Sequence, residues 1–358
     1  DDRYAIGQAS KAYLHQSLIS LHASLDGMLQ VYKGDAETIL LKLIKKYEIT
    51  DIFLNRCCEP WAVDFDAAIV KKLSVFSVKY HVYNGSYLID PYALVKADGS
   101  YYKVFGAFKK RVLALTLRKP FLKPKTFSLV CDSDNKMSID DLGLLHKNPW
   151  NEKIQNRWTA GEVEAHKQLQ HFIKKGLSGY KVGRDFPALG QTSLLSASLH
   201  YGEVSPFQVR QAIIDAEIAA RDDKSHFLGE LLWREFAAYL LTHFKTLSSE
   251  NFQKKFDRFS WQTNQKLFDA WKMGKTGYPL VDAGMRELYT TGYMHNRVRM
   301  VVASFLVKNL MIDWREGQEW FLQCLVDADL ANNSFNWQWV AGTGVDAAPY
   351  FRIFNPTT

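Results

Sequence analysis

A carboxylate, an indole and a guanidinium share one face of a predicted helix in the second half of the chain. Glu230, Trp233 and Arg234 lie in GELLWREFAAYL at spacings of three and four residues, which makes them neighbours on a helix. A Glu and an Arg in this arrangement most often form a solvated ion pair. An indole between them is also what a cavity needs to stack on a planar base and bind its polar edge. Both interpretations stay open at this point.

A second group of polar side chains follows Tyr180 in the stretch GRDFPALGQTSLLSASLHYGEVSP. Thr192, Ser193 and Ser196 fall where a helix is predicted to begin. Hydroxyls together with the free N–H groups of a helix start suit a phosphate. The same residue types also cap ordinary helices, so the pattern alone does not choose between the two roles.

The segment DADLANN, which begins at Asp327, brings two carboxylates and two amides together. Such a segment can cap a helix or hold calcium. The calcium interpretation fails, because the fifth position is Ala331, the sixth is Asn332 rather than Gly, and the twelfth is Gln338 rather than Glu. No metal site is predicted.

The elements that position these residues follow from hydrophobic periodicity. Between residues 34 and 54 the amphipathic DAETILLKLIKKYE leads into the apolar run ITDIFL, and SVFSVKYHVY follows after another helical stretch. This alternation predicts an α/β domain with a parallel sheet. Residues 117–150 have little periodicity and are rich in Lys and Pro, which is typical of a linker. We therefore predict an α/β domain at 1–116, a linker at 117–150 and an all-helical domain at 151–358.

Composition restricts the class of partner. The 358 residues carry a net charge of +7, which favours a polyanion such as nucleic acid. No apolar run approaches the roughly 20 residues of a membrane span, and residues 1–30 lack the layout of a signal peptide. We expect a soluble monomer in the cytoplasm, associated with the nucleoid, or in the nucleus if the source is a eukaryote.

Two long blocks resemble one family. They are GYPLVDAGMRELYTTGYMHNRVRMVVASF, from Gly277, and DADLANNSFNWQWVAGTGVDAAPYFRIFNP, from Asp327. Both resemble the flavin-binding core of the photolyase and cryptochrome family, and within it the cyclobutane pyrimidine dimer photolyases of the bacterial class I type. YYKVFGAFKKRVL, from Tyr101, matches a further block of the family. The resemblance implies a Rossmann-like α/β antenna domain followed by an all-α FAD-binding domain.

The resemblance is incomplete at both ends of the chain. The family has a first strand and further βα elements before the part that matches GQASKAYLHQSL, and many residues after IFNPTT. We therefore expect a fragment or a shortened form, whose sheet lacks its first elements.

The resemblance implies FAD as cofactor, active in its reduced anionic form. In photolyases the segment from Thr192 to Ser196, with the tyrosine before it, holds the ribityl chain and pyrophosphate, and the Asp-Ala-Asp segment lines the flavin. Arg299 pairs with Asp327, and Asn333 faces flavin N5, where an amide can either accept or donate a hydrogen bond. The cofactor residues implied are Tyr180, Thr192, Ser193, Leu194, Leu195, Ser196, Arg299, Asp327, Ala328, Asp329 and Asn333.

Ten tryptophans are present, and most are expected to be core residues. The resemblance singles out three of them as an electron path from the surface to the flavin. These are Trp337, nearest the ring, then Trp314 and Trp261. Trp339, two residues after Trp337, points to another face of a helix and matches the aromatic that stacks on the substrate base.

The lesion pocket follows from the same resemblance. In dimer photolyases the residue matching Glu230 bonds the pyrimidine and contributes to catalysis, and the residue matching Trp233 stacks on it. Photolyases for 6-4 photoproducts carry histidines where this chain has Asn296 and Met300; His295 is the one histidine nearby, turned about 100° away on a helix. The substrate and DNA contacts implied are Arg184, Glu230, Trp233, Arg234, Asn296, Arg297, Met300 and Trp339.

The function implied is light-driven repair of cyclobutane pyrimidine dimers in DNA by electron transfer from excited reduced FAD. The first alternative is a cryptochrome-type blue-light photoreceptor without repair activity. The second alternative is a helical DNA-binding protein without cofactor. The antenna stays open. In folate-binding relatives an Asn-Glu pair occupies the positions of Trp61 and Ala62, which argues against methenyltetrahydrofolate in that pose.

Overall fold

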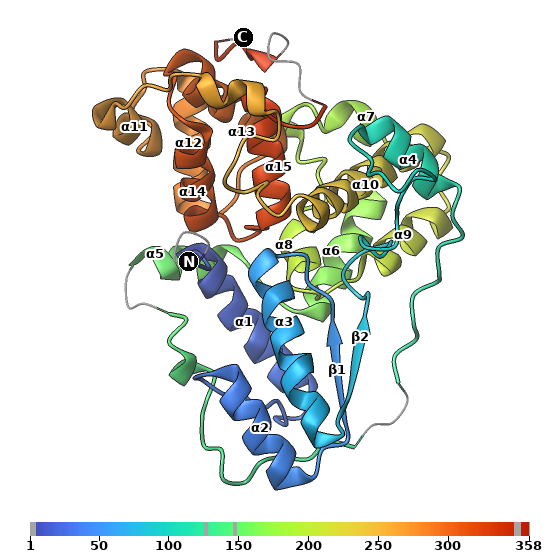
Figure 1. Cartoon of the computed structure of the whole chain (residues 1–358). Coiled ribbons are helices and arrows are strands. Elements are labelled where there is room, and N and C mark those ends of the chain that lie inside the picture. Colours follow the sequence, from blue (N-terminus) through green and yellow to red (C-terminus); the bar gives the residue numbers. More distant parts are fainter. Residues whose placement is uncertain (1–4, 125–127, 146–148, 347–351, 358) are drawn as a thin grey trace.

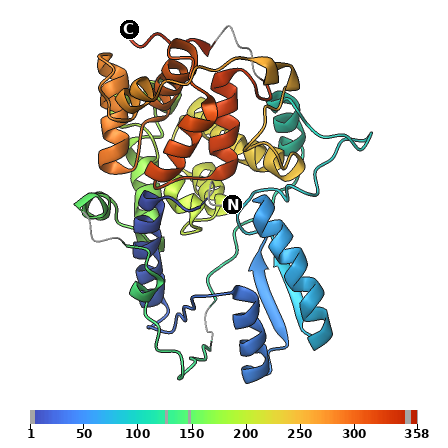
Figure 2. The same ribbon diagram turned by 60° about the vertical axis from the view of Figure 1, so that its left-hand side comes forward.

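A small α/β part and a larger helical part make up the chain (Figure 1). The computed structural model describes residues 5–124, 128–145, 149–346 and 352–357. In both views the α/β part projects from one side of the helical part, whose cavity is described below (Figure 2).

The α/β part alternates helices and strands as predicted. Strands β1 and β2 pair in parallel, with Asp51 opposite Lys79 and Asn55 opposite Tyr83. The helices cover the sheet with apolar side chains, and Ile44, Ile69 and Leu73 are buried between them. The predicted parallel sheet is therefore confirmed. Its elements are α2 (Ala36–Tyr47), β1 (Asp51–Asn55), α3 (Pro60–Leu73), the short η2 (Ser74–Phe76) and β2 (Lys79–Tyr83).

The helical part is built around α10, whose second half is buried on all sides. In chain order, the described helices of this part are α5 (Pro149–Arg157), α6 (Glu162–Lys175), α7 (Tyr180–Gly183), α8 (Ser196–His200), α9 (Pro206–Asp215), α10 (Arg221–His243), α11 (Gln265–Lys272), α12 (Pro279–Thr291), α13 (Asn296–Ser304), α14 (Trp314–Cys324) and α15 (Leu330–Ala341). Short turns η4 (Pro187–Leu189) and η5 (Lys254–Arg258) and the π-helical η6 (Phe305–Asn309) connect them. The predicted all-helical domain is confirmed for the described residues.

Two helices from the first third of the sequence pack into the helical part. Helix α1 (Gln8–Ser24) lies against α5 and α14, and Ser10 Oγ donates to the carbonyl of Leu325 at 2.8 Å. A Cβ on Gly7 would overlap the Leu322 carbonyl oxygen, so this approach requires glycine. Helix α4 (Phe105–Leu113) packs on α10. The boundaries 1–116, 117–150 and 151–358 stay a prediction.

The described residues of the predicted linker run along the outside of the α/β part (Figure 1). They contain one short turn, η3 (Asp140–Leu142). Tyr32 donates to Asp132 at 3.1 Å, and Asn135 donates to the carbonyl of Val31 at 2.9 Å. The segment is therefore attached to the residues before α2. None of the helices described is both long enough and apolar enough to cross a bilayer.

Candidate active site

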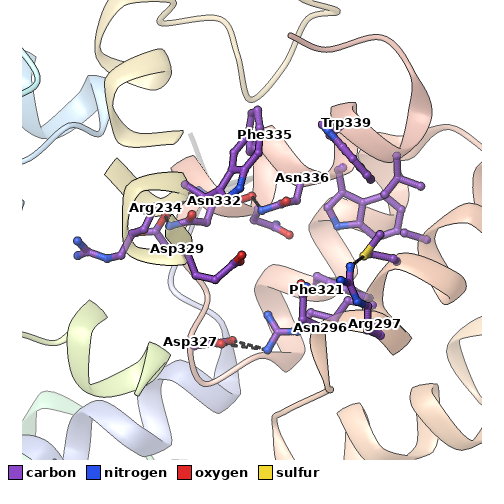
Figure 3. Close-up of a pocket in the computed structure, with 18 of the residues that line it drawn as sticks. Arg234, Asn296, Arg297, Phe321, Asp327, Asp329, Asn332, Phe335, Asn336 and Trp339 are labelled. Carbon is purple, nitrogen blue, oxygen red and sulfur yellow. Dashed lines mark hydrogen bonds and ion pairs between the residues drawn. The ribbon is translucent and has the colours of Figure 1, made fainter. Parts of the chain in front are cut away.

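A cavity of about 450 Å³ lies between helices α10, α13 and α15. A second lobe of about 250 Å³ adjoins it. The two lobes are adjacent, because six residues line both: Glu230, Arg234, Arg299, Asp327, Asp329 and Asn332. Figure 3 shows the larger lobe, in which polar and aromatic side chains alternate: Phe335 lies near Arg234 and Asn332, and Phe321 lies near Asn296 and Arg297.

Helix α10 forms one wall of the cavity. The carboxyl group on this wall pairs with an arginine that directly follows α7. Glu230 Oε1 is in close ion-pair contact with Arg184, whose side chain is 8% exposed. His226, one turn earlier on α10, has Nε2 4.0 Å from the same oxygen. Burial opposes the charge of Arg184, but the bond from Glu230 outweighs it, so the pKa of the guanidinium is raised. Arg184 thus fixes the orientation of the Glu230 carboxyl in the cavity wall.

Arg234 does not pair with Glu230, although both line the cavity. Its guanidinium donates to the carbonyl of Ser86 at 2.8 Å and contacts Glu235 at 3.4 Å. The solvated Glu230–Arg234 pair considered from the sequence is therefore absent. Trp233, between them, stacks on Phe105 of α4 with ring centroids 3.4 Å apart.

Helix α13 forms the facing wall and begins at Asn296. Asn296 and Met300 both line the cavity. His295 precedes the helix, where its Nδ1 accepts from the N–H of Arg297 at 3.2 Å, so it acts as a buried cap. Arg297 is paired with Asp185 at 2.6 Å, at the rim. His295 therefore caps α13 from outside the helix, and the expected position on the helix, turned about 100° from Asn296, is wrong.

Two carboxylates enter the cavity from the segment before α15. Arg299 Nη2 lies 2.9 Å from Asp327 Oδ2, the pair that the resemblance implies (Figure 3). Asp329 accepts from the N–H of Asn332 at 2.7 Å and so caps α15, while its other oxygen lies 3.5 Å from His200. Burial alone would raise the pKa of Asp329, but the bond and charge of His200 hold it below its ordinary range. Asp329 is therefore both a cap and an anion facing the cavity.

Asn333 and Trp337 line the cavity from α15. Asn333 Nδ2 donates to the carbonyl of Gln318 at 2.9 Å, which leaves Oδ1 and the second N–H for a ligand. Trp337 is buried and has Trp271 as an indole neighbour, with ring centroids 6.2 Å apart. Trp314 is buried outside the cavity, where its Nε1 donates to Asn251 at 3.0 Å.

The comparisons with known proteins agree with this geometry. Residues 1–125 match the family model described as DNA photolyase, and residues 227–358 match the FAD binding domain of DNA photolyase. The deoxyribodipyrimidine photo-lyase of Agrobacterium fabrum is 43% identical over 358 residues, covering 98% of this chain and 74% of the relative. The chain belongs to the DNA photolyase family.

Solved structures of photolyases and of a cryptochrome share the fold. A bacterial class III photolyase from Agrobacterium tumefaciens superposes with a TM-score of 0.92 at 43% identity, covering 98% of this chain and 74% of that one. The cryptochrome of Synechocystis superposes with a TM-score of 0.84 at 30% identity, with the same coverage. The expected class I assignment within the photolyases stays a prediction beside this class III relative.

FAD is the cofactor of this photolyase, and the two lobes fit it. The smaller lobe presents the hydroxyls of Tyr180, Ser193 and Ser196, as expected for the ribityl and phosphate end. Helix α8 starts at Ser196 without a side-chain cap, so these hydroxyls are not used in capping. The larger lobe offers Asn333 Oδ1 beside the Arg299–Asp327 pair, which suits the polar edge of a flavin.

Most of the predicted site residues come together, and some do not. All eight predicted substrate contacts line the larger lobe, with Asn333 and Trp337. Thr192, Leu194 and Ala328 are not among the lining residues, and Leu195 is buried in the core. Trp261 lies at the surface end, packed on Phe259. These roles stay predictions.

Sequence reasoning missed several residues of this photolyase's cavity. His226 could have been predicted from helical spacing, because it lies four residues before Glu230. Asn332 and Asn336 are likewise one turn apart on α15. The missed lining residues include His200, His226, Phe321, Asn332, Phe335 and Asn336. Arg352 lines neither lobe, but its guanidinium lies 3.5 Å from the centre of the Trp339 ring, a contact that no local pattern signals.

Proposed function

We propose that this photolyase repairs cyclobutane pyrimidine dimers in DNA under light. The observation that carries the proposal is the position of Glu230, held by Arg184 in a cavity that also presents Trp233 and Trp339. A carboxyl in this position can accept a hydrogen bond from the polar edge of a bound base, and indoles can stack on the faces of the base. A cavity for a purely apolar ligand would not need the Arg184–Glu230 ion pair in its wall.

Bound FAD, in its reduced anionic form, would supply an excited electron to the dimer. The chain's own residues have separate tasks. Glu230 accepts a hydrogen bond from a pyrimidine N–H and so orients the lesion in the cavity. Trp233 and Trp339 stack on the pyrimidine rings, and Asn296 and Met300 fill the remaining wall. Phe105 stacks on Trp233, and the ring centroid of Phe335 lies 5.8 Å from that of the same indole, so a base meets only the part of Trp233 that these two rings leave open.

The tryptophans supply electrons that keep the cofactor reduced. Trp337 lines the cavity, Trp314 is buried outside it, and Trp261 packs on Phe259. Because indoles are readily oxidised, the three would carry an electron from solvent to the cofactor, as the family resemblance implies. Asn333 keeps one acceptor and one donor available at the cofactor, which suits more than one protonation state.

DNA binding is supported by charge. The net charge of +7 favours phosphates, and the rim carries Arg297 beside the cavity mouth. Photolyases are a known example of enzymes that flip the target nucleotide out of the duplex, so a cavity that can receive the flipped lesion is expected. The buried Arg184 acts on Glu230 rather than on phosphates.

We further propose a monomer, located in the cytoplasm with the nucleoid, or in the nucleus of a eukaryote. No antenna is assigned.

A blue-light photoreceptor without repair is the second candidate. It is favoured by the similarity to the Synechocystis cryptochrome, which has the same coverage as the photolyase from Agrobacterium tumefaciens. The polar lining around Glu230 and Asn296 favours repair, because a sensor has no need of a pocket for a lesion.

Repair can be tested on the flavoprotein with an oligonucleotide that carries one thymine dimer. We expect light-dependent loss of the dimer, and Glu230→Ala lowers the repair yield per absorbed photon while the flavin absorbance per protein is unchanged. Glu250→Ala, at an exposed helix-flanking site, is the matched control. A flavoprotein that binds FAD and repairs no dimer would instead support the photoreceptor.

A further inference from the structure

Asn336 is an amide in the larger lobe to which no role has yet been given. It lies on α15, one turn after Asn332 and three residues before Trp339. The side chain is exposed and lines the cavity, between those of Asn332 and Trp339 (Figure 3). It therefore stands beside the indole that the proposed function assigns to stacking on a pyrimidine.

The orientation of the Asn336 amide is fixed by one bond. Nδ2 donates to the carbonyl oxygen of Asn332 at 2.8 Å. An amide oxygen cannot make this bond, so nitrogen and oxygen are distinguished. Oδ1 and the second N–H have no protein partner among the described residues. One acceptor and one donor are thus presented together to whatever occupies the cavity.

A pyrimidine dimer has two polar edges to satisfy. In each thymine the N3–H donor lies between two carbonyl acceptors, and saturation of C5 and C6 in the dimer leaves this edge intact. Glu230, an acceptor on α10, can serve N3–H of one ring. A carboxamide matches a neighbouring donor and acceptor with two bonds, as amides do when they read bases. The second ring needs such a group on another wall, and α15 provides it.

We propose that Asn336 binds the polar edge of the second pyrimidine of the lesion, accepting from its N3–H and donating to an adjacent carbonyl. The proposal rests on the proposed function and deepens it. Glu230 and Asn336 then divide the two rings between α10 and α15, with Trp339 stacking beside Asn336. An amide also pairs with cytosine, accepting from its amino group and donating to N3, so this side of the pocket accepts either pyrimidine.

Binding in the dark tests the proposal on the FAD-loaded protein. The probes are a labelled oligonucleotide with one thymine dimer and the same oligonucleotide without damage. We expect Asn336→Ala to weaken dimer binding about tenfold, the loss of one or two hydrogen bonds. Binding of undamaged DNA stays unchanged, because phosphate contacts carry it. Gln211→Ala, an amide outside the cavity on α9, is the matched control.

A second variant guards against a folding defect. Asn336→Asp has nearly the same size and keeps the acceptor for N3–H but loses the donor to the base carbonyl, so its preference for the dimer also falls. Unchanged preference in either variant overturns the proposal. Equal losses for damaged and undamaged DNA also overturn it, since they indicate a general defect. A wild-type protein that neither prefers nor repairs the dimer refutes the proposed function as well; a loss of preference in the variants alone supports both.

Discussion

The buried carboxyl of Glu235 predicts a pH dependence of stability with a defined sign. Glu235 is 1% exposed on α10, and its Oε2 accepts from the N–H of Ile89 at 3.3 Å. Burial raises the pKa of this carboxyl from 4.5 to about 7, although Arg234 and the bonds from the backbone oppose the change. The group therefore titrates near neutrality in the folded protein.

The magnitude follows from the two pKa values. Between them the folded protein keeps a proton that the unfolded chain has lost, so the free energy of unfolding falls as the pH rises from 4.5 to about 7. The difference corresponds to about 3 kcal/mol at full effect. In Glu235→Gln the titration is removed and the acceptor for Ile89 remains. The variant should therefore gain stability relative to wild type as the pH rises through this range.

Urea unfolding of both proteins, with FAD at one fixed excess, measures this difference at each pH. Glu48→Gln, at an exposed position after α2, controls for replacing a carboxylate by an amide. The refuting result is a difference between Glu235→Gln and wild type that stays constant with pH, or that moves in favour of wild type. A constant difference would show that the carboxyl of Glu235 has the same pKa in both states, and a change in favour of wild type would show that folding lowers it.

Two further substitutions test how the site is supported. A Cβ in Gly317→Ala would overlap the ring of Trp337, so we expect a loss of about 1–3 kcal/mol in unfolding free energy and slower photoreduction of the flavin; an unchanged melting temperature would contradict this packing. In Arg299→Ala the 5% exposed Asp327 loses its partner, at a cost of about 3–5 kcal/mol, and we expect the purified protein to lose FAD absorbance. Arg286→Ala is its control, and full FAD content in Arg299→Ala would refute the role.

Local patterns predicted the elements well. The parallel pairing of β1 with β2 follows from alternating apolar runs, and α8 starts at Ser196, within the segment predicted to begin a helix, although no hydroxyl caps it. The lining of the cavity by Glu230 and Trp233 follows from helical spacing. These features depend on residues close in sequence, and the hydrophobic repeat of about 3.6 residues in helices or 2 residues in strands predicts them directly.

Long-range partners could not be predicted in this way. The sequence offers Arg234 as the neighbour of Glu230, but the partner in the structure is Arg184, forty-six residues earlier. The packing of Phe105 on Trp233 likewise joins α4 to α10 across the linker. Such pairs are decided by which helices meet, and no period within one helix encodes that. Resemblance to relatives, rather than spacing, placed Arg299 beside Asp327.

The positions of α1 and α4 bear on how the chain folds and how it can be divided. Both precede the linker, yet α1 fills a groove against α5 and α14, and α4 places Phe105 on Trp233. A piece that begins after the linker would lack both helices and expose the apolar surfaces they cover. Formation of the cavity therefore waits for contacts between distant parts of the chain, which makes folding slower and more cooperative than two independent modules would allow.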